Sequence, residues 1–110
     1  MKYEPLNRKE VEDFILELVG VKLDFPFGES VAVYKVKEKM FALIQEGKEP
    51  ISISLKCDPV LSETLQERYE SVMPGYHLNK KHWITVVLTG QLSIEEIKDL
   101  ILLSFNLVNN

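Results

Sequence analysis

The stretch of this 110-residue chain with the clearest capacity for chemistry is Pro74–Trp83, with the sequence PGYHLNKKHW. It contains both histidines, the only tryptophan and two adjacent lysines, and it contains no acidic residue. Lysine side chains bind phosphate oxygens, and aromatic rings stack on nucleobases or on other planar groups. The composition therefore indicates a basic, aromatic surface.

The same stretch has the pattern of a β-hairpin. If Asn79-Lys80 forms a two-residue tip, His77 lies opposite His82 and Tyr76 lies opposite Trp83. The aromatic pair would then be either a stacking platform or part of an ordinary core with its polar atoms at the edge. The sequence leaves both interpretations open.

A metal site on His77 and His82 is an alternative that predicts bound zinc or nickel. Two histidines fall short of the three protein ligands of typical catalytic sites, and Cys57 and Asp58 complete a set only if the fold brings them close. The usual metal-binding spacings are missing. We expect structural histidines, no metal and no cofactor.

No pattern in the chain supports catalysis. A Gly-rich phosphate loop, a His-Glu-x-x-His motif and a nucleophile elbow are all missing from the sequence. Cys57 falls on the apolar side of an alternating segment, where a lone cysteine is usually a small buried hydrophobe. We therefore expect a protein that is not an enzyme and has no catalytic residues.

Hydrophobic periodicity predicts the elements that must position these residues. Helices begin at capping residues Asn7, Asp58 and Ser93, and alternation predicts strands on both sides of short turns. The predicted order is α-β-β-β-α-β-β-α, with the first three strands in an antiparallel meander. The first three strands lie at 30–36, 39–45 and 51–57, the hairpin with its tip at Asn79-Lys80 continues as a strand at 84–88, and a shorter extended piece lies at 21–25. The aromatics of Phe25-Pro26-Phe27-Gly28 are expected to plug the core.

Composition limits the classes of protein to consider. Hydrophobic residues make up 45% of the chain, charged residues 27%, and the formal net charge is −4, which predicts one domain over 1–110 rather than a strongly basic nucleic-acid coat. Met1–Pro5 has no pattern of a secretory signal, and the longest apolar run, Leu100–Leu103, is too short for a bilayer. A single cysteine fits a reducing compartment. We expect a cytoplasmic protein.

The charge is unevenly distributed. Residues 31–58 carry five lysines against four acids and residues 76–83 carry two lysines and no acid, so these strand-forming parts sum to +3 and the remainder to −7. Such segregation is typical of a basic binding face with an acidic back. The alternative is that lysine protects exposed strand edges while glutamate favours helices.

Several blocks of the chain, in the same order, resemble the MmcQ/YjbR family of small bacterial proteins. The blocks are Phe25–Gly28, Tyr34–Val36 with Lys39–Leu43, Leu55–Pro59, Pro74–Trp83 and Leu103–Val108. The resemblance implies a secretion-chaperone-like α+β fold, α-β(3)-α-β(2)-α, with an antiparallel sheet and helices packed on one face. It also implies a DNA-binding role in which hairpins act as a pair of wings against the duplex.

The resulting hypothesis is a non-enzymatic, monomeric protein that binds double-stranded DNA through basic hairpins and does not bind membranes. The alternative is a module that binds a protein, a peptide or a small anion. The candidate DNA-binding residues are Lys35, Lys37, Lys39, Lys56, Tyr76, His77, Asn79, Lys80, Lys81, His82 and Trp83.

Overall fold

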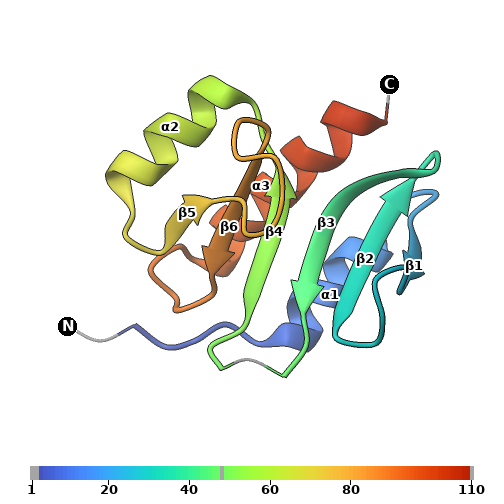
Figure 1. Ribbon diagram of the computed structural model, residues 1–110. Coiled ribbons are helices and arrows are strands. Elements are labelled where there is room, and N and C mark those ends of the chain that lie inside the picture. Colours follow the sequence, from blue (N-terminus) through green and yellow to red (C-terminus); the bar gives the residue numbers. More distant parts are fainter. Residues whose placement is uncertain (1–2, 48, 110) are drawn as a thin grey trace.

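The computed structural model describes residues 3–47 and 49–109. Met1 and Lys2 lie outside the described residues; they are part of the Met1–Pro5 segment, which was not expected to be a secretory signal. Within the described ranges, the chain forms three helices and six strands (Figure 1). They are α1 Arg8–Leu16, β1 Lys22–Asp24, β2 Val31–Val36, β3 Lys39–Gln45, β4 Ser52–Lys56, α2 Pro59–Arg68, β5 Val72–Pro74, β6 Trp83–Val87 and α3 Ile94–Val108. None of these helices is long and apolar enough to cross a membrane.

The strands form one antiparallel sheet in the order β1-β2-β3-β4-β6-β5. The predicted meander of β2, β3 and β4 is confirmed, as is the two-residue turn between β2 and β3 at Lys37 and Glu38, which both have positive φ. The structure adds one strand to the expected order. The extended piece at Lys22–Asp24 pairs with β2 as an edge strand, so four strands precede α2.

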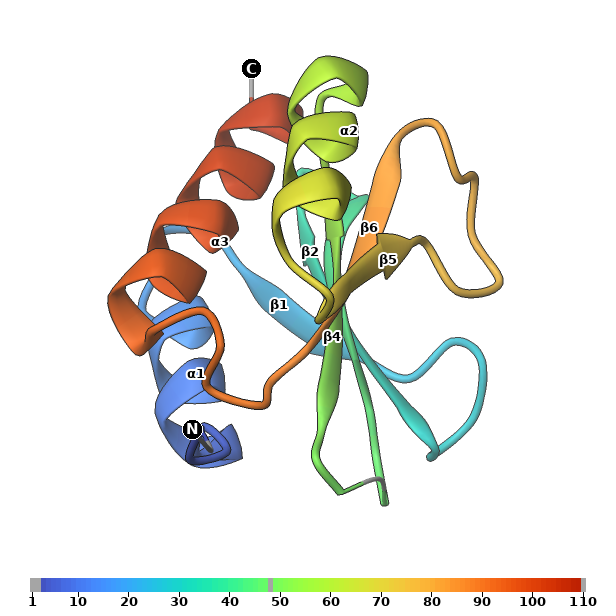
Figure 2. The ribbon, with the colours of Figure 1, turned by 90° about the vertical axis from the view of Figure 1, so that its left-hand side faces the viewer.

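All three helices pack on the same face of the sheet, as predicted (Figure 2). Alternate strand residues such as Ala32 and Ile53 meet Val11 from α1, Leu65 from α2 and Ile97 from α3 in one apolar cluster. This side of the sheet, the covered face, holds most of the buried hydrophobic residues. Its burial provides the main driving force for folding.

The helix starts are capped as the sequence predicts. The Asn7 side chain accepts a hydrogen bond from Glu10 N, and Asp58 Oδ2 accepts from the first free amides of α2. Ser93 and Glu96 form a reciprocal capping box at α3. These bonds satisfy donors that have no partner within the helix.

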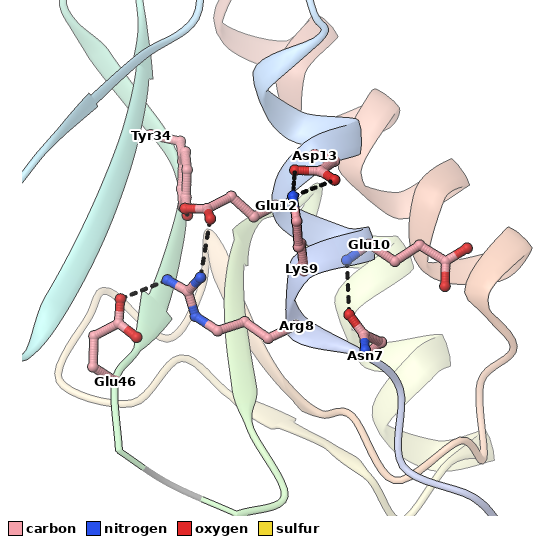
Figure 3. A network of polar contacts seen from close by, with 8 residues as sticks. All are labelled: Asn7, Arg8, Lys9, Glu10, Glu12, Asp13, Tyr34 and Glu46. Atoms are coloured by element: carbon pink, nitrogen blue, oxygen red, sulfur yellow. Dashed lines mark hydrogen bonds and ion pairs between the residues drawn. The ribbon is translucent and has the colours of Figure 1, made fainter.

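A polar network ties α1 to the sheet (Figure 3). Arg8 donates to Glu12 at 3.1 Å and to Glu46 at 2.5 Å, and the hydroxyl of buried Tyr34 donates to Glu12 at 2.7 Å. Burial, followed by the hydrogen bond to Glu12, raises the pKa of Tyr34 well above its ordinary value. Arg8 and Tyr34 therefore share Glu12 as an acceptor, while Arg8 Nε is buried without a hydrogen-bond partner among the described residues.

The prediction that Phe25 and Phe27 plug the core is wrong. Their exposed fractions are 42% and 60%. The chain leaves β1 after Asp24 and turns at Gly28, whose φ of +103° suits glycine. This turn carries the backbone of residues 25–30 away from the sheet on the side opposite the helices (Figure 2).

Candidate functional site

The side of the sheet opposite the helices, the uncovered face, has a small apolar floor of its own. Buried Val33, Leu43 and Trp83 form a cluster there, against which Val31 and Leu78 pack. Trp83 is only 5% exposed, which favours the interpretation of this ring as ordinary core rather than as a stacking platform. Val33, on this side of β2, is fully buried.

Two loops project from the uncovered face and rise on either side of its floor (Figure 2). The aromatic loop, residues 25–30, joins β1 to β2, and the basic loop, residues 75–82, joins β5 to β6. They are far apart in the sequence but face each other across the sheet. Both belong to the blocks that carry the family resemblance.

The space between the two loops is a trough of about 300 Å³. Its walls are aromatic: Phe27 comes from the aromatic loop, and Tyr76 and His77 come from the basic loop. None of the described residues that line it is acidic. The lining residues are Phe27, Val31, Leu43, Gln45, Ser54, Tyr76, His77 and Leu78.

The basic loop is not the tight hairpin that the sequence predicted. Pro74 pairs with Ile84 and Gly75 N donates to Trp83 O, so Gly75, rather than Tyr76, lies opposite Trp83. The intervening residues form a wide loop because local side chains satisfy its backbone. Asn79 Oδ1 accepts from the amides of residues 81 and 82, at 2.9 and 3.3 Å, and Lys80 Nζ donates to Gly75 O at 2.9 Å.

Two contacts anchor the basic loop to the sheet. Tyr76 N donates to Thr85 Oγ1 at 2.9 Å, and the Thr85 hydroxyl also shares a 2.8 Å hydrogen bond with Ser54 Oγ. Gly75 passes so close to β6 that a Cβ atom at this position would lie 2.7 Å from Trp83 Cβ. The start of the loop is therefore held in one position.

The predicted lysines do not form one continuous patch. Lys35 lies on the uncovered face but pairs with Asp24 at 3.3 Å, and Lys56 lies 5.6 Å from the centre of the Trp83 ring. Lys37 reaches the other way, to the carbonyl of Asn109 after α3. Exposed Lys39 is at the β2–β3 turn.

The strongest local concentration of positive charge is at the tip of the basic loop. Lys80, Lys81 and His82 are exposed, and within the described part of the chain neither lysine makes an ion pair with a carboxylate. The backbone carbonyl of His82 accepts from Cys57 N at 2.8 Å. This contact holds the end of the loop against β4.

The histidines and Cys57 are placed differently from one another. His77 has a φ of +59°, and its ring lies against that of Tyr76 with centroids 4.0 Å apart. Cys57 lies in the core of the covered face, where burial, with a smaller contribution from Asp58, raises the pKa of its thiol to about 11. The thiol is therefore protonated at neutral pH, which makes it a poor nucleophile. Residues 3–47 and 49–109 contain no group of three potential metal ligands.

Sequence reasoning missed the trough. Phe27, Gln45, Ser54 and Thr85 were not candidate residues, because their role depends on pairing between distant strands. The signal available in the sequence was the pair of aromatic residues in the turn with Pro26 and Gly28. Such a constrained turn can place aromatic side chains outside the core as readily as inside it.

Comparisons with known proteins agree with this geometry. The family model described as YjbR matches residues 16–107. An uncharacterised Escherichia coli O157:H7 protein, YbdF, is 45% identical over 84% of this chain and 76% of its own length. An uncharacterised Bacillus subtilis protein, YyaQ, is 31% identical over 93% of this chain and 98% of its own.

The crystal structure of Deinococcus radiodurans protein DR2400, described as containing a DUF419 domain, superposes with a TM-score of 0.89. Its sequence is 35% identical to this one, and the match covers 100% of this chain and 83% of that chain. The agreement of fold and sequence over this length is well beyond what a shared architecture alone produces.

Proposed function

The chain belongs to the YjbR family, and from that premise we propose that it is a monomeric, non-enzymatic protein that binds DNA through the phosphate backbone. The observation that carries the proposal is the basic loop. It projects from the uncovered face and presents Lys80, Lys81 and His82 with no acidic residue among residues 75–82.

The conformation of the basic loop suits phosphate binding. Asn79 and Gly75 accept the hydrogen bonds that hold the loop in shape, so little order has to be gained on binding. The ammonium group of Lys80 has further donors after its bond to Gly75 O, and Lys81 extends into solvent. Lys39 and Lys56 supply additional positive charge on neighbouring strands.

The affinity expected from this arrangement is modest. Lys37 is directed toward α3 and Lys35 is paired with Asp24, so roughly four phosphate contacts remain. For a duplex, four contacts correspond to a slope of about −4 in log affinity against log salt concentration. The formal net charge of −4 further weakens long-range attraction.

A second candidate function is a module that binds a peptide, another protein or a small anion. The observation in its favour is the trough, because a concave site with an apolar floor suits a compact ligand better than the convex surface of a duplex. This candidate predicts binding that depends on the aromatic walls and only weakly on salt.

Fluorescence anisotropy of labelled DNA at several salt concentrations tests the proposal. The decisive variant is Lys80→Glu/Lys81→Glu, which we expect to lose at least tenfold in affinity. The matched control is Lys9→Glu/Arg68→Glu, which has the same formal net charge but changes exposed residues on α1 and α2. Equal losses in the two variants, or binding that does not respond to salt, would contradict a phosphate-binding role for the basic loop.

A further inference from the structure

We infer that the trough accepts an unpaired nucleobase, so that the preferred ligand is a single-stranded stretch of nucleic acid rather than an intact duplex. This inference rests on the proposed function, because it names the form of nucleic acid that the same face binds. It follows from the aromatic walls, size, edge chemistry and charge of the trough.

The first argument is the pair of aromatic walls. Phe27, which is 60% exposed, forms one wall, and Tyr76, which is 46% exposed, forms the other together with His77. A nucleobase is planar and offers a π-face to each side, so it can stack between such walls whatever its identity.

The second argument is size. A volume of about 300 Å³ lies at the lower end of pockets that hold small ligands, which suits one ring system and excludes a double helix. A base within a duplex would have to leave its stack to enter. An unpaired base in a single strand breaks no base pair and gives up less stacking, so it enters at a much smaller free-energy cost.

The third argument is the chemistry of the floor and edge. Val31 and Leu43 provide an apolar surface for the ring, and Gln45 is also in the lining. The side-chain amide of glutamine both donates and accepts hydrogen bonds, which matches the mixed pattern on the edge of a base. The trough can therefore hold both the face and the edge of a base.

The fourth argument is the asymmetry of charge across the trough. The basic-loop side carries Lys80 and Lys81, whereas the aromatic-loop side carries Glu29 and Asp24, the latter paired with Lys35. A sugar-phosphate backbone is therefore favoured along the basic loop, with its base directed toward Phe27. One orientation of the strand satisfies both the charge and the stacking.

The test compares single-stranded DNA, single-stranded RNA and duplex DNA of equal length by fluorescence anisotropy. The decisive variant is Phe27→Ala. The matched control is Phe25→Ala, which removes a ring from the same loop that is 42% exposed but does not line the trough. Circular dichroism and thermal unfolding establish that both variants are folded.

We expect single strands to bind at least tenfold more tightly than the duplex. Phe27→Ala should lose about tenfold in single-strand affinity without changing the salt slope, because stacking is lost while the phosphate contacts remain. Phe25→Ala should lose less than about twofold. The ratio of DNA to RNA affinity then shows which sugar the site prefers.

Other outcomes separate this inference from the function on which it rests. Equal affinity for duplex and single strand, with no effect of Phe27→Ala, would overturn the inference and leave DNA binding in place. Absence of binding to every nucleic acid at low salt would overturn both. Binding of an extended peptide that Phe27→Ala abolishes, without nucleic-acid binding, would assign the trough to the second candidate function.

Discussion

The two faces of the sheet use alternate residues of the same strands and differ in how their polar groups are satisfied. On the covered face, Arg8, Glu12, Tyr34 and Glu46 hydrogen-bond to one another within a network that joins α1 to the sheet. On the uncovered face, the cations of the basic loop make no ion pair within the described part of the chain. The first arrangement stabilises the fold, and the second leaves charge available for a partner.

The cavities on the two faces also differ, in the residues that line them. The covered face has an apolar cleft of about 230 Å³ between α2 and α3, with Leu61, Leu103 and Leu107 in its lining. The trough on the uncovered face is lined in part by exposed aromatics, and the basic loop that supplies Tyr76 and His77 also carries exposed Lys80 and Lys81. Substitutions on the covered face should therefore change stability, and those on the uncovered face should change binding.

The largest expected effect is that of Phe41→Ala on the covered face. Phe41 is fully buried and packs edge-to-face on Phe105 with ring centroids 5.5 Å apart. Its truncation should cost about 3–5 kcal/mol in the free energy of unfolding, measured by urea denaturation. Phe27→Ala should cost under about 0.5 kcal/mol, because its ring is largely in solvent. Similar losses of unfolding free energy in Phe41→Ala and Phe27→Ala would contradict the distinction between the two faces.

A smaller effect is expected for Tyr34→Phe. The variant loses the hydrogen bond to Glu12 and should be about 1–2 kcal/mol less stable at neutral pH. Because the pKa of Tyr34 is raised in the folded state, its contribution is complete below the unfolded value near 10 and decreases as the pH rises above it. The wild type should therefore lose more stability than the variant between about pH 10 and 12. Parallel loss in both proteins would show that Tyr34 does not titrate as the structure implies.

An effect on stability no larger than that of Tyr34→Phe, combined with a measurable effect on binding, is expected for Thr85→Val. The variant removes the acceptor for Tyr76 N and should loosen the start of the basic loop. We expect a loss of about 1 kcal/mol in stability and severalfold in affinity for single-stranded DNA. Thr85→Ser keeps the hydroxyl and serves as the control. Affinity unchanged in Thr85→Val would mean that the anchoring of the loop is not required for binding.

Local sequence signals predicted most of the elements, whereas the strand expected after Gly75 lies instead at Val72–Pro74. Residues 39–45 alternate strongly enough to define β3 to the residue, and Asp58-Pro59 marks the start of α2 through chemistry that acts over one helical turn. The missed features depend on long-range contacts. The pairing of β1 with β2 decides that Phe27 points away from the core, and the Asn79 bonds replace a tight hairpin with a wide loop.

The candidate site was predicted in part. The sequence identified the basic loop through its composition, but it grouped Lys37 with the other lysines because alternation does not show which way an exposed side chain turns. The trough needs residues from β2, β3, β4 and both loops. No single segment of sequence carries the signal of such a site.

The measurement that most directly tests the central claim is a titration of isotope-labelled protein with a short single-stranded oligothymidylate, followed through backbone amide chemical shifts. The account predicts that the shifts concentrate at residues 25–30 and 75–83 and at Gln45 and Ser54. The amide chemical shifts of α1 and α3 should not change. Shifts confined to the cleft between α2 and α3, or no shifts at low salt, would contradict the assignment of the binding site to the uncovered face.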